Sequence, residues 1–426
     1  MKVNVLVFPC GSEIGLEVYR SLATAKEVVL FGASSVKDHG EFVYRNYISS
    51  VPFVSDRLFL VAINKIVKEY AIDYIIPAHD TVVLRLAEAS RTGNLNCKLL
   101  TSSYEACATC CSKKLTHQLL SPHLHMPRLY ESISDVIDWP VFLKPDYGSG
   151  SRGAVIARNF AEADCHIKGG KNLLIFEYLP GDEYTVDCFT DRHGAIIFCG
   201  GRKRERISNG ISVRTLPDND PKFLEIALKI NKTLKLRGVW YFQAKRDING
   251  CLALMEVAPR IAGAMGLYRN LGVNFALMGL YDAEGFDVKI IQNHFQILLD
   301  RALESRFKVD LQYEHVYLDY DDCIIFNNQI NIQIVSFLYQ CVNHGVGVSL
   351  LTRHIGDIEA ELTKNKLRQL FVDVIRIVDG APKSFFIRHK KSIFIDDSFA
   401  ERKNVLEETG IPVFSPDAVE SLLTIM

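Results

Sequence analysis

The sequence predicts a mixed α/β and α+β protein made of three successive parts. Three observations support this fold class. Strand-like and helix-like patterns alternate over residues 1–103, a hairpin pattern and a Gly/Ser-rich loop occupy residues 104–305, and the alternation of strands and helices restarts near residue 312. With 426 residues, each part is long enough to bury a hydrophobic core of its own.

The first part is predicted to form a parallel sheet with helices on both faces. Short β-type runs occur at residues 3–8, 28–33 and 73–79. The first turn carries Gly11 and Gly15 but lacks the Gly-x-Gly-x-x-Gly pattern, and no acidic residue follows at the spacing expected for ribose binding. The sequence therefore weighs against a nicotinamide site. The glycines are interpreted as positions where the first helix packs closely against its strand. The helical stretches are residues 12–22 and 59–70.

Composition excludes several classes of partner. Charged residues make up 23% of the chain and the net charge is −1, so neither nucleic acid nor an anionic membrane is expected to bind. The stretch "MKVNVLVFPCG" lacks the features of a signal peptide, and no apolar run reaches the roughly 20 residues that span a bilayer. The eleven cysteines include no paired Cys-x-x-Cys units at zinc spacing. We therefore expect a cytoplasmic protein with reduced thiols. The cluster "CATCC" is expected to pack in a helix near Lys113, with a redox role as the alternative.

The middle part contains a candidate phosphate-binding loop. In "WPVFLKPDYGSGSRGAV", Lys144 ends an apolar strand and is followed by Ser149, Gly150 and Ser151. Glycines let backbone N–H groups approach a polyphosphate, and a lysine on the preceding strand adds a positive charge. The loop is not a Walker P-loop, because no Gly-Lys-Ser/Thr ends it. The alternative is a plain flexible connection.

A hairpin further along the chain carries a candidate metal site. Asn249-Gly250 is a strong signal for a two-residue turn, which places Gln243 directly opposite Glu256. Directly opposed side chains are roughly 4.5 to 5.5 Å apart at Cβ, close enough to share a hard cation such as Mg²⁺. Arg260 follows and could neutralise a phosphate. The alternative is a pair of solvated polar residues on an exposed sheet face.

Four motifs in order resemble the ATP-grasp superfamily, especially the branch like the carbamoyl-phosphate synthetase large subunit. The motifs are "CCSKKLTHQLL", "VFLKPDYGSGSRG", "FEYLPGDEYTVD" and "YFQAKRD...LMEVAPRIAG", and the resemblance covers roughly residues 1–300. It implies a Rossmann-like pre-ATP-grasp domain over residues 1–103 and an ATP-grasp domain over residues 104–305. A lid subdomain over about residues 118–180 is expected to close over ATP.

The resemblance also implies the roles of individual residues. Lys113 and Lys144 would contact phosphate oxygens, with Lys114 as the substitute if the motif is shifted by one residue. Gln243 and Glu256 would bind Mg²⁺, with Mn²⁺ as an alternative ion. The family usually has Asn two residues after the metal-binding Glu, and Ala258 stands there instead, so one metal ligand is missing or comes from elsewhere. The implied ATP-binding residues are Lys113, Lys144, Ser149, Gly150, Ser151, the hinge residues Glu177, Tyr178 and Leu179, and Glu183 on the ribose.

The chemistry of the family implies a ligation. A carboxylate attacks the γ-phosphate of ATP to form an acyl phosphate, and an amine then displaces the phosphate. The expected partners are therefore small-molecule carboxylates and amines, some of them phosphorylated, and a homo-oligomer is among the states that the sequence allows. Arg260 and the stretch "GRKRERISNGIS", with Arg202, Arg204 and Arg206, are the candidates for substrate recognition. An exposed, solvated basic loop is the alternative for that stretch.

The last part places polar residues just after predicted strands. Asp319 and Asp321 end the strand pattern "HVYLDYDD", Thr352 ends the next one, and Asp396 and Asp397 end "SIFIDDS". Between the last two of these strand patterns, a helix is expected over residues 355–370. Because the carboxyl ends of parallel strands share one edge of a sheet, these side chains are expected to meet there. Carboxylates that repel one another become stable around a divalent cation. The sequence therefore predicts a magnesium and phosphate site.

These residues resemble the haloacid dehalogenase-like (HAD-like) phosphatase superfamily over roughly residues 312–426. The resemblance implies that Asp319 is the nucleophile that takes the phosphoryl group and that Asp321 is the general acid/base. Cys323 departs mildly from the Thr or Val that is common in the family, and the segments between the motifs leave little room for a large cap domain. Thr352 would bind phosphate, Lys383 would stabilise it, and Asp396 with Asp397, together with Asp319 and Asp321, would hold Mg²⁺.

Two functions are consistent with these two resemblances. The first is a bifunctional biosynthetic enzyme, in which the ATP-grasp part forms a C–N bond and the HAD-like part removes a phosphate from a substrate or from the ligated product. The second is a protein in which only one half is catalytic and the other serves as a binding or regulatory module. The identities of the carboxylate and the amine depend on loops without a readable motif.

Overall fold

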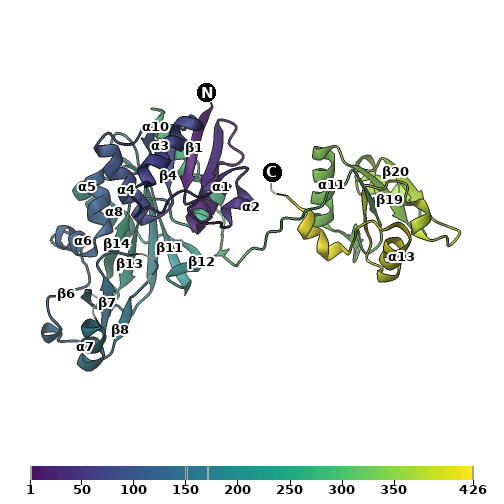
Figure 1. Cartoon of the computed structure of the whole chain (residues 1–426). Helices are drawn as coiled ribbons and strands as arrows, with labels where there is room; N and C mark the ends of the chain where they lie inside the picture. The colour runs from purple at the N-terminus through teal and green to yellow at the C-terminus, as the bar shows by residue number, and fades with distance from the viewer. Residues whose placement is uncertain (1, 149, 151, 170–171, 425–426) are drawn as a thin grey trace. The chain divides into compact units, whose positions relative to one another are not determined.

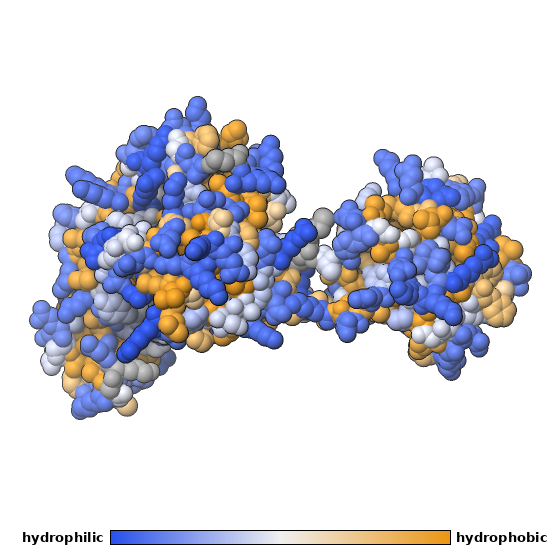
Figure 2. Space-filling model, turned by 45° about the horizontal axis from the view of Figure 1, so that its top comes forward, coloured by the Kyte–Doolittle hydropathy of each residue, from blue (hydrophilic) through white to orange (hydrophobic). Residues whose placement is uncertain are grey.

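The computed structural model describes residues 2–148, 150, 152–169 and 172–424. Contacts divide the chain into two compact units, Met1–Leu303 and Glu304–Met426, and each unit is described by itself (Figure 1). On the visible face of each unit, hydrophilic and hydrophobic residues are interspersed, as is normal for a folded surface (Figure 2). In the described part of the chain, no helix combines the length and the apolar character needed to cross a bilayer.

The first unit begins with the predicted parallel sheet. Five strands pair in the order β3-β2-β1-β4-β5, and every pairing is parallel. Helix α1 packs so closely that a Cβ on Gly15 would lie 2.3 Å from the Cys10 carbonyl oxygen, which confirms the packing interpretation of this glycine. The strands are β1 Val3–Phe8, β2 Val28–Ala33, β3 Asn46–Ile48, β4 Tyr74–Pro77 and β5 Lys98–Leu99, and the helices are α1 Glu13–Leu22, α2 Gly40–Val43, α3 Phe59–Glu69 and α4 Asp80–Arg91.

A six-stranded antiparallel sheet follows in the same unit. Its order is β14-β13-β10-β11-β12-β15, and helices α5, α6 and α8 contribute Ala106, Leu120 and Ile230 to the core against it. The cluster "CATCC" lies in α5, immediately before the helix that starts at Lys113, as predicted. The strands are β10 Glu183–Thr190, β11 Ile196–Ser208, β12 Ile211–Asp218, β13 Gly238–Arg246, β14 Leu252–Ala258 and β15 Leu299–Asp300. The helices are α5 Tyr104–Cys111, α6 Lys113–Leu120, α8 Lys222–Leu234, α9 Gly266–Asn270 and α10 Phe275–Ala283.

A smaller antiparallel sheet with a core of its own lies between α6 and β10 in the sequence. Its order is β6-β9-β7-β8, and Val141, Leu143 and Ile175 are buried within it. This sheet falls within the stretch predicted as a lid. Its elements are β6 Leu129–Tyr130, the 3₁₀ helix η1 Ile133–Asp135, β7 Val141–Pro145, β8 Val155–Ala157, α7 Phe160–Lys168 and β9 Leu173–Glu177.

The hairpin between β13 and β14 has the predicted pair but a different turn. Gln243 pairs with Glu256, as expected. The predicted two-residue turn is wrong, however, because the Gly250 N–H donates to the Asp247 carbonyl and Gly250 takes a φ of 78°, which makes a three-residue loop. That loop shifts the register by one residue, and a β-bulge that leaves Met255 without a partner in the ladder shifts it back.

The second unit is a five-stranded parallel sheet in the order β20-β19-β16-β21-β22. The predicted strand and helix alternation is confirmed, but the helix expected over residues 355–370 stops at Lys364 and is followed by a short 3₁₀ helix, since Lys366 takes a positive φ of 59°. The strands are β16 His315–Leu318, β17 Ile325–Phe326, β18 Gln329–Ile330, β19 Gly347–Thr352, β20 Asp373–Arg376, β21 Ser392–Ile395 and β22 Val413–Phe414. The helices are α11 Ile332–His344, α12 Ile358–Lys364, η2 Arg368–Leu370, η3 Lys383–Phe386, α13 Phe399–Thr409 and η4 Pro416–Leu422.

Candidate functional site

The pair Gln243 and Glu256 forms the first candidate metal position. Both side chains are half-buried and stand opposite each other on β13 and β14. In the part of the chain that the structure describes, neither oxygen-bearing group makes a hydrogen bond or an ion pair. Two free oxygen donors on neighbouring strands fit a hard cation. Ala258, two residues further on, is 7% exposed and offers no side-chain oxygen.

Lys144 comes to this position from the small sheet. Its ammonium lies 4.3 Å from the centre of the Phe176 ring and is buried. The pKa of Lys144 is lowered to about 8, mainly by burial and also by the charge of Lys113, against the raising effect of Glu256 and Glu183. Lys144 is therefore within electrostatic reach of the second predicted lysine and of both carboxylates.

The N-terminus of α6 holds Lys113. Ser112 caps the helix and donates to the Asp146 carboxylate at 2.9 Å, while the Lys114 N–H donates to the same carboxylate at 2.9 Å. Lys113 Nζ donates to the Gly148 carbonyl at 2.9 Å, so it contacts the start of the Gly/Ser loop. The structure therefore brings Lys113 to this loop, and the Lys114 side chain remains the alternative that the sequence left open.

The loop itself is only partly described. Ser149 and Ser151 lie outside the described residues. Gly148 and Gly150 take positive φ values of 135° and 64°, which glycine adopts without strain. The loop therefore needs glycine at these two positions for its backbone path, independently of any ligand.

The predicted hinge and ribose positions lie at the junction of the two sheets. Glu177 ends β9, where its carboxylate accepts from the Arg128 N–H at 3.0 Å, and Leu179 is buried. Tyr178 has the Lys245 ammonium 5.7 Å from its ring centre. Glu183, at the start of β10, forms an ion pair with Arg204 and lies 3.8 Å from Lys245.

The basic stretch lies mainly on β11 and β12. The alternative of an exposed, solvated loop is therefore wrong for Arg202 and Arg204, which are buried, whereas Arg206 is exposed. Arg202 is 1% exposed and binds the Asp187 carboxylate through Nε at 2.6 Å and Nη2 at 2.8 Å. Arg204 pairs with Glu183, and Arg206 pairs with Asp300 at 2.9 Å. Residues two apart share one face of a regular strand, so alternation alone does not explain why Arg206 is exposed. The ladder between β11 and β12 shifts its register between Arg204 and Arg206, which interrupts the regular face at that point.

Arg260 has a partner that the sequence did not reveal. Its guanidinium binds the Asp80 carboxylate with Nε and Nη2 at 2.5 and 2.8 Å. Burial alone would raise the pKa of Asp80, but the charge of Arg260 outweighs it and the pKa is lowered. Asp80 begins α4 directly after the predicted strand 73–79, and a carboxylate at the carboxyl end of a parallel strand was the available signal.

The second unit brings three predicted residues together. Lys383 is 2% exposed, and its ammonium lies 2.6 Å from Asp396 and 3.1 Å from Asp319. Burial would lower the pKa of Lys383, but the two carboxylates outweigh it and raise this pKa. The pKa of Asp396 is raised to about 6, mainly by burial and also by Asp319, against the lowering effect of Lys383. Asp319 follows β16 and Asp396 follows β21, as the parallel sheet requires.

A candidate cation position lies next to this lysine. Asp319, Cys323 and Asp397 each offer one ligand atom, and these atoms lie within 4.8 Å of one another. Two carboxylates fit Mg²⁺, whereas a thiol is a poor ligand for it. Asp396 instead faces Lys383 and the Ser398 N–H, so the structure separates the two aspartates that the sequence placed on one metal.

Asp321 and Thr352 lie at the same edge of the sheet. Thr352 ends β19 and is fully buried, and its hydroxyl accepts from the His354 N–H at 3.2 Å. The Asp321 carboxylate is paired with His354 Nδ1 at 2.9 Å and is not in the Asp319, Cys323 and Asp397 cluster. His354 was missed from the sequence, although its place two residues after Thr352 at a strand end was a signal.

Comparisons with known proteins bear on the first unit. Residues 170–301 match the family model described as "ATP-grasp in the biosynthetic pathway with Ter operon". A solved structure of pyruvate carboxylase from Rhizobium etli is similar, with 16% identity and a TM-score of 0.57, over 67% of this chain and 29% of that chain. This chain thus spans less than a third of that carboxylase.

Two other solved structures are covered more fully. N5-carboxyaminoimidazole synthetase from Staphylococcus aureus, complexed with ADP, has 17% identity and a TM-score of 0.57 over 68% of this chain and 81% of its own. The L-amino acid ligase from Bacillus licheniformis has 14% identity and a TM-score of 0.54 over 68% and 75%. The family model and the structural similarities agree, and the larger part of this chain therefore has an ATP-grasp fold.

Proposed function

We propose that the first unit is an ATP- and Mg²⁺-dependent ligase that joins a carboxylate to an amine through an acyl phosphate. The observation that carries the proposal is the position of Glu256 opposite Gln243, which gives two oxygen ligands on neighbouring strands, with Glu256 within electrostatic reach of the buried Lys144. The ATP-grasp fold supports it, and so does the L-amino acid ligase among the similar structures. The substrates of those proteins are not assigned to this chain.

The residues of the chain have separate tasks in this reaction. Lys144 and Lys113 hold phosphate oxygens and offset the negative charge that builds up during phosphoryl transfer. Glu256, with Gln243, holds the cation, which when bound polarises the phosphate oxygens. The small sheet over residues 129–177 carries Lys144, so closing it over the nucleotide would exclude water that could hydrolyse the acyl phosphate. No covalent intermediate on the protein is required.

The test is a search for a condensed product by mass spectrometry. Reactions contain ATP, Mg²⁺, pooled carboxylates and pooled amines, some of them phosphorylated. The expected result is ADP together with a condensed product, with at least a hundredfold loss of both in Glu256→Gln, since the neutral amide binds the cation poorly. Asp182→Asn, which alters an exposed ion pair with Lys203 in the same unit, is the matched control and should keep full activity. ATP turnover that survives in Glu256→Gln would contradict the assignment.

We infer a second activity, the hydrolysis of a phosphate ester, for residues 304–426. The observation that favours it is Asp319 beside Lys383, with Asp396 on the other side of the same ammonium. A carboxylate at the end of a central strand can take a phosphoryl group, and a buried lysine can stabilise the transferred charge. Asp321 would protonate the leaving alcohol and then activate water, with His354 holding its carboxylate.

Hydrolysis of p-nitrophenyl phosphate with Mg²⁺ tests this second activity. Asp319→Asn should abolish release of p-nitrophenol, because an amide cannot take the phosphoryl group. Asp322→Asn is the matched control, since Asp322 is exposed and has a φ of 53° that Asn also tolerates. Equal loss in both variants would indicate damage to the fold, and full activity in Asp319→Asn would exclude the nucleophile.

The two activities form one bifunctional enzyme in this proposal. A phosphorylated substrate would be ligated by the first unit, and its phosphate, before or after ligation, would be removed by the second. In the ligation assay, Asp319→Asn should then give a product that keeps its phosphate. If ADP forms but phosphate is retained with the wild type as well, only the first unit is catalytic and the second is a binding or regulatory module.

A further inference from the structure

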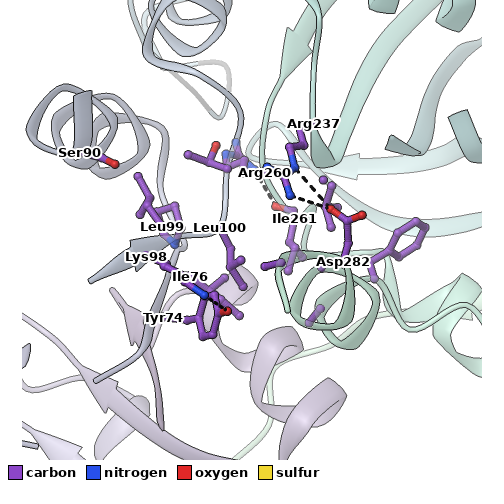
Figure 3. A pocket seen from close by; sticks show the side chains of 18 residues that line it. Tyr74, Ile76, Ser90, Lys98, Leu99, Leu100, Arg237, Arg260, Ile261 and Asp282 are labelled. Atoms are coloured by element: carbon purple, nitrogen blue, oxygen red, sulfur yellow. Dashed lines mark hydrogen bonds and ion pairs between the residues drawn. The ribbon is translucent and has the colours of Figure 1, made fainter. Parts of the chain in front are cut away.

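A cavity of about 400 Å³ lies in the first unit, and none of Lys113, Lys144, Gln243 and Glu256 lines it. One wall comes from the parallel sheet, with Tyr74 and Ile76 of β4 and Lys98 of β5 (Figure 3). Facing them are Arg237, Ile261 and Asp282, which follow the parallel sheet in the sequence. A cavity of this volume falls within the range of small-molecule sites.

The cavity is separate from the proposed nucleotide site. Gly238 and Val239 at the start of β13 line it, whereas Gln243 lies further along the same strand. At about 3.3 Å per residue, the four residues from Val239 to Gln243 span roughly 13 Å. A molecule in the cavity would therefore leave Gln243 and Glu256 free.

The lining combines apolar walls with an excess of positive charge. Its charged members are the three cations Lys98, Arg237 and Arg260 and a single carboxylate, Asp282. Arg260 is fully engaged by Asp80, and Lys98 lies 3.5 Å from Glu284. The apolar members of the lining are Ile76, Leu99, Leu100, Val239, Ile261 and Phe275.

Arg237 keeps its Nη1 group available to a ligand, because within the described residues only its Nε and Nη2 side-chain groups make hydrogen bonds. Its side chain is 53% exposed and holds Asp282 only loosely, with contacts of 3.3 and 3.4 Å. Asp282 is 3% exposed and is also bound by the Arg192 N–H at 2.8 Å, so its charge is shared. A guanidinium at the rim of an apolar cavity suits the anionic group of a ligand whose body lies inside.

The floor of the cavity includes a glycine with open space above it. Gly279 lies on α10, and a Cβ built there would have only Val239 Cγ2 within 4 Å, at 4.0 Å. Helix formation does not require glycine here, because glycine weakens a helix. A larger side chain at this position would project into the space that the lining residues enclose.

We propose that this cavity binds a small molecule with an anionic group, a carboxylate or a phosphate, on an apolar or aromatic body. Arg237 binds the anionic group, and the apolar walls around Ile261 and Phe275 bind the body. The proposal does not rest on the ligase or phosphatase activities, because none of Lys113, Lys144, Gln243 and Glu256 lines the cavity. Its occupant is neither the nucleotide nor the cation of those activities.

The experiment uses two fluorescent probes that differ by one charged group. 1-Anilinonaphthalene-8-sulfonate carries an anionic sulfonate on an aromatic body, and N-phenyl-1-naphthylamine is the same body without it. Dissociation constants are measured by fluorescence for the full chain, Gly279→Phe and Arg237→Gln. Arg158→Gln changes an exposed arginine directly after β8 and is the matched control. Thermal stabilisation by MgADP checks that each variant is folded and, separately, tests the nucleotide site.

The two variants should separate the contribution of the probe's aromatic body to affinity from that of its charged group. Gly279→Phe should weaken both probes by about tenfold or more, because it fills the cavity. Arg237→Gln should weaken the sulfonate probe by about tenfold and leave the uncharged probe unchanged. If Gly279→Phe binds both probes as tightly as the wild type, the probes bind elsewhere and the proposal fails. Equal effects of Arg237→Gln and Arg158→Gln would refute the role of Arg237.

Discussion

Lys144 shows how one residue can be tuned by its surroundings. It is carried by the small sheet but is buried near Glu256 of the larger sheet, and burial lowers its pKa to about 8. A bound polyphosphate would favour the charged ammonium and raise this pKa again. Nucleotide binding above pH 8 must therefore take up a proton.

The pH dependence of nucleotide affinity follows from this shift. Below pH 8, Lys144 is charged with or without nucleotide, so affinity should be flat. As pH rises above 8, the free protein loses the proton and MgADP affinity should fall by up to tenfold per pH unit. Isothermal titration calorimetry between pH 7 and 9.5 measures this change in MgADP affinity. Lys144→Arg keeps its charge throughout and should abolish the decline. An identical decline in Lys144→Arg would assign the proton to another group.

Residue-level prediction from the sequence succeeded where a chemical group follows a strand end. Asp319 and Asp396 each follow a strand of the parallel sheet and meet at one edge, as expected. Lys383, which lies between them, begins η3 and was predicted only from the family resemblance. Asp80 and His354 were missed because their partners lie 180 and 33 residues away in sequence, and no local pattern reveals such a pair. The roles proposed for these side chains remain predictions.

At the scale of elements, a buried ion pair joins β10 to β11. Arg202 and Asp187 are 1% and 0% exposed, and the guanidinium makes two hydrogen bonds to the carboxylate. Hydrophobic periodicity could not predict this pair, since a basic run is usually a solvated surface. Only the alternation of a strand, once known, places Arg202 inside and its neighbour Lys203 towards solvent.

Removing one partner of this pair should be costly. Arg202→Met leaves the Asp187 charge buried and unpaired, and should lower the free energy of unfolding of the first unit by about 3–5 kcal/mol. Denaturant unfolding measures it. Lys203→Met, which breaks the half-exposed pair with Asp182 on the same strands, is the control and should cost no more than about 1 kcal/mol. The double variant Arg202→Met/Asp187→Leu should recover most of the loss, and a loss equal to that of Arg202→Met would contradict this explanation.

Strands and helices were easier to predict than the turns and helix ends between them. The strands at residues 3–8 and 28–33 were located from composition because β-branched and aromatic residues fill them. The predictions for the turn at Gly250 and for the end of α12 near Lys366 were wrong, because each of these features depends on a single residue with positive φ. The pair Gln243 and Glu256 was still correct, because the bulge at Met255 cancels the shift that the turn introduces.

At the scale of the whole molecule, the chain divides near Leu303. Residues 301–313 form the connection and contain neither helix nor strand, and each unit has its own hydrophobic core. Within the first unit, two ion pairs join α1 to residues that follow strands of the six-stranded sheet: Arg269 with Glu17 and Arg301 with Glu13. The parallel sheet and the six-stranded sheet of the first unit should therefore unfold together.

Calorimetry tests this division. Differential scanning calorimetry of the full chain should give two transitions, and MgADP should raise the Tm of only one of them. Trypsin should cut first at Arg306 or Lys308, in the connection, and release two fragments that resist further digestion. A single transition that shifts as a whole with MgADP would show that the two units are thermodynamically coupled.

The bulge at Met255 affects how relatives of this chain should be aligned. A β-bulge adds one residue to a strand without changing which residues stand opposite each other on either side of it. A homologue with a regular strand here and the same loop would keep its counterparts of Gln243 and Glu256 in place with one residue fewer between them. A search pattern with a fixed spacing would miss that homologue, whereas one that permits a single gap at position 255 would find it.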